Sequence, residues 1–495
     1  MDQVRDIPTT YGEIMNNLDQ RTRWLALYTL CLGDLLIVLD MSIVNVALPS
    51  IQADLGFSQT ALAWVVNAYL LTFGGFLLLS GRLGDLFGNK RLFQIGVVSF
   101  TAASIACGLA PSAGLLVAGR AIQGFGGAAV SAVALALIMG LFSDDGDRAK
   151  AMGVFGFVMS GGGAVGALLG GVLTGLLNWH WIFLVNVPIG IAVWVLAKRI
   201  LPQDEVVPGS SRIDVPGAVL VTLSMMLAVY GVVGGNEAGW TSARTLGLLA
   251  GSAVLLTVFV VWESRTAAPL VPLRLFALRN VSISQVVGVL WAGAMFAWFF
   301  LATLYLQQVL GYDALDIGLA FLPTSLVMAY CSLKVSDRLV MRFGIRPPLV
   351  AGLSCASVSL LLFSRAPVDG TFAVDVLPAL ILMGIGAGIA FNPVLLAAMG
   401  DVEPHEAGLA SGVVNTSFMM GGALGLAVFV SLSSWRTGSL LADGEVPLVA
   451  LNEGFQISFL AAAVAALSAA VIGGALLRPK PMQVPEEPSL VDTSA

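Results

Sequence analysis

Three charged side chains lie inside otherwise apolar stretches, and their types suit proton or ion chemistry. Asp34 and Asp40 fall in the apolar run over residues 24–48, and Arg120 falls in the run over residues 113–139. If these runs cross a bilayer, each charge costs roughly 2.5–3.5 kcal/mol on insertion scales, so it must face the helix bundle or a cavity. The pattern therefore predicts a pathway for protons or charged substrates.

Asp40 is the leading candidate for reversible proton binding, and Arg120 is its candidate electrostatic partner. At about 1.5 Å per helical residue, both lie roughly 12 Å from the same end of their spans, so they can meet. A pair that changes on protonation would couple proton binding to movement. The alternatives are structural: Asp40 is a permanently paired acid, and Arg120 clamps a backbone carbonyl.

Asp34 is a second acid in the same span, about 240° around the helix from Asp40. It shares a face with Met41 and Asn45, which follow it at helical spacing. Two acids on different faces could separate proton binding from substrate binding, which makes Asp34 an auxiliary acid. The alternative is that Asp34 only meets a polar partner on a neighbouring span.

The elements that position these residues are membrane spans. The chain is 57 % hydrophobic and 11 % charged, whereas soluble domains carry roughly a quarter charged residues. Because a span needs about 20 apolar residues, the sequence predicts an all-α polytopic membrane protein with fourteen transmembrane helices. The predicted spans cover residues 24–48, 61–82, 92–110, 113–139, 151–176, 181–199, 214–234, 245–264, 280–310, 314–334, 348–364, 374–399, 407–433 and 455–477.

Basic residues predict the orientation of these spans. With the N-terminus in the cytosol, almost every Lys and Arg outside the spans is cytosolic, and Arg244, Arg365 and Arg436 lie on the opposite side. This asymmetry follows the positive-inside rule. We therefore expect a multi-pass protein of the cell (inner) membrane with both termini, residues 1–23 and 478–495, as cytosolic tails.

A weak internal repeat predicts two halves. The charged, glycine-rich stretch 81–91 follows the second span, and a degenerate copy at residues 336–347 follows the tenth. Two six-helix halves, 24–200 and 280–477, would then flank a linker, 201–279, that contains two extra helices. Two such halves around a midplane site are typical of secondary transporters. We expect stretch 81–91 to be a compact turn between spans.

Glycines in the predicted fifth span could form a helix seam. Gly162, Gly166 and Gly170 recur at four-residue intervals, with Gly171 beside them. Small residues at this spacing allow helices to approach closely and slide. One interpretation is a seam between the halves that controls leakage, and the other is ordinary helix packing.

Polar and aromatic residues in the central spans suit a cavity for lipophilic cations, since ring faces attract positive charge. Alternatively, many of these rings face lipid. The candidates for lining a substrate cavity are Asn45, Trp64, Asn67, Tyr69, Gln123, Trp298, Tyr305, Gln308, Asn392 and Asn415. The sequence contains no nucleophile–base set, no metal-ligand pattern, and no Walker lysine beside its glycine clusters. We therefore expect neither an enzyme nor a cofactor nor nucleic-acid binding.

Four motifs give the chain a family resemblance. Stretch 81–91 resembles the signature loop of the major facilitator superfamily. Residues 39–49, 120–124 and 179–190 are similar to the first-, fourth- and sixth-span motifs of its fourteen-span drug:proton antiporters. The resemblance covers about residues 20–480. It implies the major facilitator fold, importance of Asp40 for transport, and a gating role for Gly81, Asp85, Gly88, Lys90 and Arg91. The alternative for Asp85 is simple marking of topology by charge.

The function expected from residues and resemblance together is export of lipophilic drugs or antibiotics by exchange for protons. The proton gradient would supply the energy, and the partners would be the lipid bilayer and a small lipophilic substrate that can carry positive charge. No obligate protein partner is evident in the sequence. One alternative is a narrow-specificity exporter of one endogenous metabolite or antibiotic, as in self-resistance. A non-transporting membrane sensor is a further alternative, but it would carry soluble domains that this sequence lacks.

Overall fold

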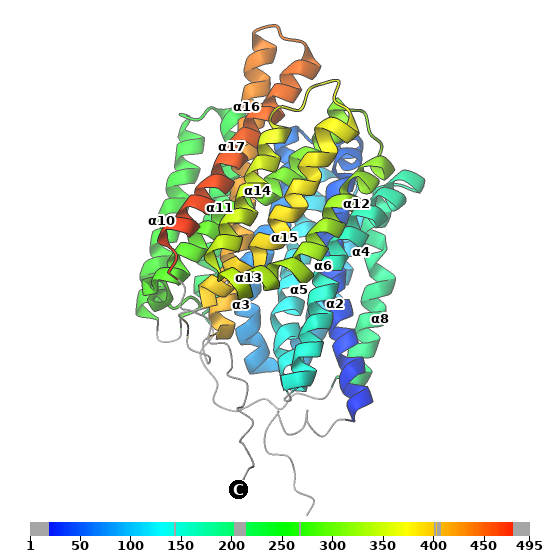
Figure 1. The fold of residues 1–495 in the computed structure, drawn as a ribbon, viewed down its shortest axis with the longest axis vertical. Helices are drawn as coiled ribbons and strands as arrows, with labels where there is room; N and C mark the ends of the chain where they lie inside the picture. Colours follow the sequence, from blue (N-terminus) through cyan, green and yellow to red (C-terminus); the bar gives the residue numbers. More distant parts are fainter. Residues whose placement is uncertain are drawn as a thin grey trace, which may run out of the picture.

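The computed structural model describes residues 19–142, 145–201, 214–266, 269–399, 402 and 407–478, and within them it contains helices and no strand. The helices lie side by side in one bundle (Figure 1). The first ten segments are α2 (Gln20–Leu55), α3 (Gln59–Phe87), α4 (Asn89–Gly108), α5 (Ala113–Leu141), α6 (Asp145–Leu176), α7 (His180–Leu184), α8 (Asn186–Ile200), α9 (Val215–Ala238), α10 (Ala243–Arg265) and η1 (Leu273–Ala277). The remainder are α11 (Arg279–Leu304), η2 (Tyr305–Val309), α12 (Ala314–Tyr330), η3 (Cys331–Ser336), α13 (Asp337–Phe343), α14 (Arg346–Phe363), η4 (Phe372–Val376), α15 (Leu377–Met399), α16 (Ala407–Ala442) and α17 (Pro447–Leu476).

The helices have the length and composition of membrane spans. In the described part of the chain, 13 helical segments are long and apolar enough to cross a bilayer. The predicted fifth span corresponds to α6, whose described apolar stretch, Val165–Leu176, is shorter. These helices are apolar around most of their circumference, as helices buried in lipid and in a bundle must be. The expected all-α polytopic fold is confirmed.

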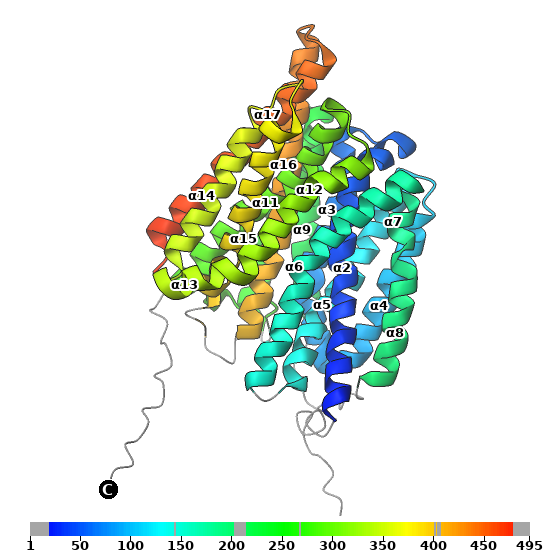
Figure 2. The same ribbon diagram turned by 45° about the vertical axis from the view of Figure 1, so that its right-hand side comes forward.

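The helices pack as two sets. In the first set, α5 packs against α3 and α4, and α2 packs against α6, α8 and α5. In the second, α11 packs against α16 and α17, and α14 packs against α15 and α17. The sets are joined chiefly by α6 with α12 and by α3 with α16 (Figure 2), and to a smaller extent by α2 with α11 and α12. A movement of the helices in the first set can therefore be transmitted to the second set through α3 or α6.

The helices α9 and α10 form a hairpin beside one of these junctions. Helix α9 packs against α10 and also against α3 and α16. Ser224 of α9 donates a hydrogen bond to the Ser252 carbonyl of α10, at 2.9 Å. In Figure 1, α10 lies at the edge of the bundle. The hairpin thus covers the α3–α16 junction from outside.

The stretch 81–91 is mostly helical, which corrects the expected compact turn. Gly81 to Phe87 complete α3, and α4 begins at Asn89. The break is confined to Gly88, whose φ of 96° is a conformation that side chains disfavour. The second stretch, residues 336–347, breaks in the same way at Gly344, with φ 77°. One left-handed glycine is enough to end each helix, so no longer loop is needed.

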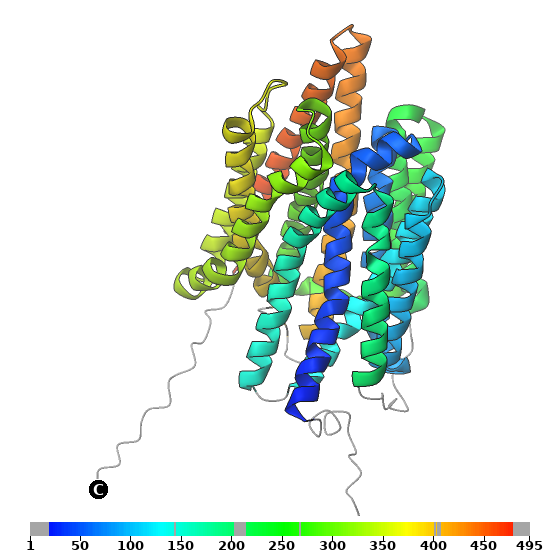
Figure 3. The same cartoon turned by 90° about the vertical axis from the view of Figure 1, so that its right-hand side faces the viewer.

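The backbones of α6 and α12 approach each other most closely near one end. Figures 2 and 3 show the two helices close together near the upper end of the view and diverging below it. At the upper end, a Cβ placed on Gly171 of α6 would lie 2.6 Å from the Ala314 carbonyl oxygen of α12. The two sets of helices are therefore in backbone contact at this end.

Candidate functional site

Asp40 and Arg120 form a buried ion pair. Asp40 is fully buried and Arg120 is 2 % exposed. The Nη1 atom of Arg120, on α5, donates to Oδ2 of Asp40, on α2. The similar depth expected from the sequence therefore results in direct contact. A buried ion pair of this kind is held by its hydrogen bonds, because the desolvation of two charges must be offset.

Amide side chains surround the second oxygen of Asp40. Gln123 Nε2 donates to Oδ1 at 3.1 Å, and Asn186 Nδ2, from α8, donates to the same atom at 2.9 Å. Gln123 also accepts from Arg120 Nη1 at 2.9 Å and donates to Ser104 Oγ of α4 at 2.8 Å. Both carboxylate oxygens are therefore occupied, so Asp40 accepts hydrogen bonds from α5 and α8, and Ser104 of α4 holds the amide of Gln123.

The guanidinium of Arg120 makes two further contacts with α3. Its Nε donates to the Val65 carbonyl at 2.9 Å. Its Cζ lies 4.4 Å from the centre of the Tyr69 ring, within the range of a cation–π contact. Both structural roles considered for these residues, a paired acid and a clamp on a carbonyl, are thus present in this state. They do not exclude a change of partners after protonation.

Protonation of Asp40 would remove the ion pair with Arg120, and deprotonation would restore it. With Asp40 ionised, the charges of Asp40 and Arg120 cancel in a buried site. With Asp40 protonated, Arg120 keeps its charge and loses its counter-ion, an imbalance of the kind that costs roughly 3–5 kcal/mol when a buried pair is broken. The surrounding helices must then rearrange to solvate Arg120 or admit another charge. This is the chemistry expected of a coupling site.

Asp34 occupies a separate polar contact on the other side of α2. It is 1 % exposed. Its Oδ1 accepts from Ser131 Oγ of α5 at 2.7 Å, and its Oδ2 has no hydrogen-bond partner among the described residues. The two acids of α2 thus meet different groups, as expected from their angular separation. Asp34 has the polar partner that the structural alternative requires, and its auxiliary role stays a prediction.

Comparison with known proteins decides the family. The sequence profile described as Major Facilitator Superfamily matches residues 30–426. The chain belongs to the major facilitator superfamily. The resemblance of its motifs is thereby confirmed, and so is the expectation of a transporter and not an enzyme.

Curated relatives of this major facilitator are resistance and export proteins. It is 39 % identical over 461 residues to the puromycin resistance protein pur8 of Streptomyces alboniger, covering 92 % of this chain and 91 % of that protein. It is 41 % identical over 422 residues to the cephamycin export protein CmcT of Amycolatopsis lactamdurans, covering 84 % and 86 % respectively. The lincomycin resistance protein of Streptomyces lincolnensis is 36 % identical over 417 residues, with coverage of 83 % and 85 %.

A solved structure shows the same fold at low sequence identity. The crystal structure of an auto-inhibited peptide transporter of the POT family superposes with a TM-score of 0.64 and 16 % identity. The match covers 95 % of this chain and 99 % of that one. At this identity the likeness concerns the fold alone.

The predicted gating residues of this major facilitator lie at the α3–α4 junction. Lys90 Nζ donates to the carbonyl of Lys198 at 3.2 Å and to that of Leu201, at the end of α8. A cation at a helix C-terminus is stabilised by the helix dipole. In this state Lys90 thus binds within its own set of helices. Arg91 lies in the first turn of α4. The side chain of Asp85 lies outside the described part, so its predicted latch is not visible.

The four predicted seam glycines face two different neighbours. Cβ atoms on Gly162, Gly166 and Gly170 would lie 2.8–2.9 Å from atoms of α2. These three glycines therefore give the close packing of α6 on α2, as the alternative of ordinary packing expects. Gly171 faces Ala314 and Gly318 of α12. Of the four, Gly171 is the one placed at the contact between the two sets of helices.

The predicted cavity residues are dispersed in this state. Gln123 and Tyr69 belong to the Asp40 cluster, described above, and Asn67 lies on α3 with no hydrogen-bond partner for its amide among the described residues. The others have separate neighbours. Asn45 donates to the Met41 carbonyl, Trp64 lies near Tyr230, Trp298 packs on Phe321, Tyr305 donates to the Pro367 carbonyl, Gln308 donates to Gln52, Asn392 donates to the Ser332 carbonyl, and Asn415 lies on α16.

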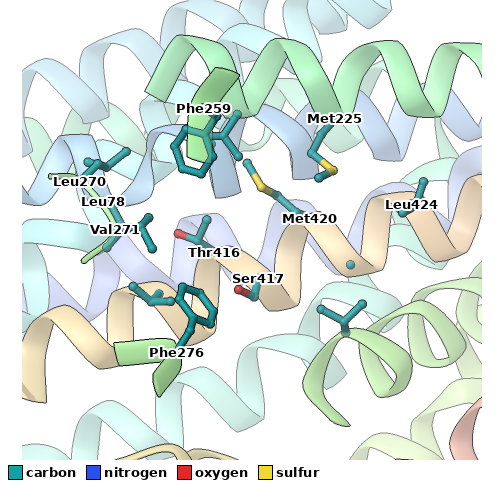
Figure 4. Close-up of a pocket in the computed structure, with 15 residues that line it drawn as sticks. Leu78, Met225, Phe259, Leu270, Val271, Phe276, Thr416, Ser417, Met420 and Leu424 are labelled. Atoms are coloured by element: carbon teal, nitrogen blue, oxygen red, sulfur yellow. The ribbon is translucent and has the colours of Figure 1, made fainter. Parts of the chain in front are cut away.

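A pocket lies beside the α3–α16 junction (Figure 4). Its volume is about 220 Å³, and side chains of α3, α9, α10, α11 and α16 line it together with the segment before α11. Apart from Thr416 and Ser417, its lining is apolar. None of the residues predicted for the substrate cavity lines this pocket. The sequence signal for it was weak, since it depends on packing between distant apolar helices.

Proposed function

We propose that this major facilitator exports a lipophilic drug or antibiotic in exchange for protons. The observation that supports the proposal most directly is the Asp40–Arg120 pair, a buried ion pair whose charge balance changes by one on protonation. The named activities of its relatives, resistance to puromycin or lincomycin and export of cephamycin, support the substrate class. In this proposal the proton gradient is the energy source.

The orientation follows from the basic residues. We infer that the protein lies in the cell membrane with both termini in the cytosol, so that the upper end in Figure 3 faces outside. The state described here then has its two sets of helices in contact on the outer side, at Gly171. Alternating access requires this contact to open when substrate leaves.

The coupling step is assigned to the first set of helices. A proton that reaches Asp40 from outside releases Arg120, and a proton leaving to the cytosol restores the pair. The partners of Asp40 lie on α5 and α8, while α2 also packs on α6. Movement of α2 or α5 during exchange would therefore reach the contacts with α12 and α16. In this proposal Asp34, on a different face of α2, binds a second proton or a cationic substrate.

The test is transport in inverted membrane vesicles with an imposed pH gradient. Wild-type vesicles should accumulate a lipophilic dye only when the gradient is present, and Asp40→Asn should abolish this dependence. The matched control is Asp443→Asn, because Asp443 is an exposed acid beyond α16. Gradient-independent uptake by wild type, or normal coupling in Asp40→Asn, would overturn the antiport mechanism.

A narrow-specificity exporter is the second candidate. It is favoured by relatives that are named for a single antibiotic each. A resistance panel in a pump-deficient host separates the two candidates: broad resistance to unrelated lipophilic cations supports multidrug export, and protection against a single compound class supports self-resistance.

A further inference from the structure

Two buried carboxyl groups close the lower end of the α9–α10 hairpin, away from the Asp40 cluster. Asp214 caps the start of α9 and is 4 % exposed, and Glu263, in the last turns of α10, is 3 % exposed. Each carboxyl group has one oxygen that is well bound. Asp214 Oδ1 accepts from the Gly217 amide at 2.9 Å and from Trp262 Nε1 at 2.7 Å. Glu263 Oε2 accepts from the Val271 amide at 3.1 Å.

The remaining oxygens of the two groups lie beside the same empty position at Gly217. Asp214 Oδ2 and Glu263 Oε1 are buried and have no hydrogen-bond partner among the described residues. Both oxygens flank the side-chain position that Gly217 leaves empty: a Cβ there would lie 2.6 Å from Asp214 Oδ2 and 2.7 Å from Glu263 Oε1. The two carboxyl groups are within hydrogen-bonding reach of each other. Two acceptors in this arrangement need a donor between them.

We propose that Asp214 and Glu263 bind one proton between them, which forms a second proton site that is separate from Asp40. One group is then a carboxylic acid that donates to the other, a carboxylate, in the manner of close carboxyl pairs. The proton comes from water and returns to it, and no bond other than O–H is made or broken. Loss of this proton leaves two like charges in contact in a buried place.

Charged groups of both signs lie on the elements around the pair. The charge that acts on Glu263 is that of Asp214. Arg279 is engaged elsewhere, since its Nε donates to the Leu476 carbonyl at 3.0 Å. The basic residues on the elements packed around the pair are Arg82 of α3, Arg265 of α10, Arg274 of η1 and Arg279 of α11.

The pair is also connected to the pocket in Figure 4. Val271, whose amide is held by Glu263, lines this pocket together with its neighbour Leu270. Phe259, one helical turn before Glu263, lines it from α10. The shared proton thus fixes one wall of the pocket, and its loss would release the segment that carries Val271. The hairpin would then respond to pH independently of the Asp40 site.

The test is infrared difference spectroscopy of the full chain in lipid nanodiscs during a pH titration. The double variant Asp34→Asn/Asp40→Asn serves as background, because it removes both acids of α2. We expect a carboxylic-acid carbonyl band that disappears as the pH rises. Adding Glu263→Gln, or separately Asp214→Asn, should abolish the band, because the new amide donates to the remaining carboxylate and leaves it ionised.

Three results would overturn the proposal. The first is a band that survives in one of the two single substitutions, since it would identify a lone protonated acid. The second is no band attributable to either residue in the background variant or in wild type. The third is a melting temperature at alkaline pH that Na⁺ or K⁺ raises in wild type but not in Glu263→Gln, since that would identify a cation site.

A glycine pair supplies an independent check. Gly217→Ala should displace the two oxygens, lose the band and lower the melting temperature. Gly234→Ala, in the same helix, places its methyl group where no atom lies within 4 Å and should change neither. Retention of the band in Gly217→Ala would contradict the shared proton. None of these measurements depends on transport, so the result is independent of the proposed export function.

Discussion

Gly171 of α6 and Gly318 of α12 pack backbone against backbone. A Cβ on Gly171 would lie 3.3 Å from the Gly318 Cα, and a Cβ on Gly318 would lie 2.9 Å from the Ala167 carbonyl oxygen. Any side chain at either position must push α6 and α12 apart. This contact is therefore a point where a small substitution changes the balance between states of the transporter.

Gly171→Ala should destabilise the described state by roughly 1–3 kcal/mol, the usual cost of overpacking a tight contact. The matched control is Gly175→Ala, one turn further along α6, where the added methyl group would meet Leu315 at an ordinary 3.6 Å. We expect a lower melting temperature and slower dye transport for Gly171→Ala only. Equal effects in both variants would show that the loss does not come from the contact between Gly171 and α12.

A crosslink between Gln52 and Gln308 should test whether the helices separate at the end of the bundle where Gly171 lies. Gln308 Nε2 donates to Gln52 Oε1 at 2.7 Å, which joins α2 to η2. A Gln52→Cys/Gln308→Cys variant, treated with a short bifunctional thiol reagent, should crosslink and lose transport. A cleavable reagent should restore transport on reduction. Transport that continues at full rate in the crosslinked protein would mean that these helices need not separate.

The two members of the buried ion pair should respond unequally to removal. Arg120→Ala leaves the Asp40 carboxylate uncompensated, and we expect a loss of roughly 3–5 kcal/mol in stability. Asp40→Asn also leaves the Arg120 charge without its counter-ion, but it keeps an oxygen that can accept from the neighbouring donors. We therefore expect a smaller loss of stability together with loss of proton coupling. Melting temperatures in nanodiscs, compared with vesicle transport, separate the two effects. A more stable Arg120→Ala than Asp40→Asn would contradict this reading of the cluster.

Asn186 should be a positioning residue for Asp40. Asn186→Leu removes one of the two amide donors to Asp40 Oδ1, a hydrogen bond to a charged group that is worth roughly 1.5–3 kcal/mol. We expect the pH profile of dye transport to move, because the carboxylate loses a donor that favours its ionised form. Asn178→Leu, which changes an amide outside the cluster, is the control. An unchanged pH profile in Asn186→Leu would assign Asn186 a packing role only.

The fold was accessible from the sequence because hydropathy reports span positions directly. The predicted spans agree with the observed helices, and the depth argument brought Asp40 and Arg120 to the same level. The partners Asn186 and Ser104 were not predicted as site residues, although both interrupt apolar runs. A polar residue in a span indicates a buried contact, but only the packing of α8 on α2, and of α4 on α5 and α8, reveals which atom it meets.

Features that depend on tertiary packing were less accessible from the sequence. The stretch 81–91 reads as a loop because it is charged and rich in glycine, yet Gly88 alone breaks the helix. The candidate cavity residues lie on central spans but face different neighbours, since the rotation of each helix is set by packing. Asp214 and Glu263 were not singled out, because acids near span ends look like ordinary boundary residues until their orphaned oxygens are seen.

Every side chain that holds Asp40 comes from helices before α9: Arg120 and Gln123 from α5, and Asn186 from α8. In the proposed mechanism the proton site is therefore built within the first set of helices, and sequence changes after α10 do not touch the side chains that hold Asp40. The groups that hold Asp40 and the helices after α10 can therefore be exchanged separately. A chimaera that takes α11–α17 from a relative should inherit that relative's substrate preference while keeping the proton dependence of this chain.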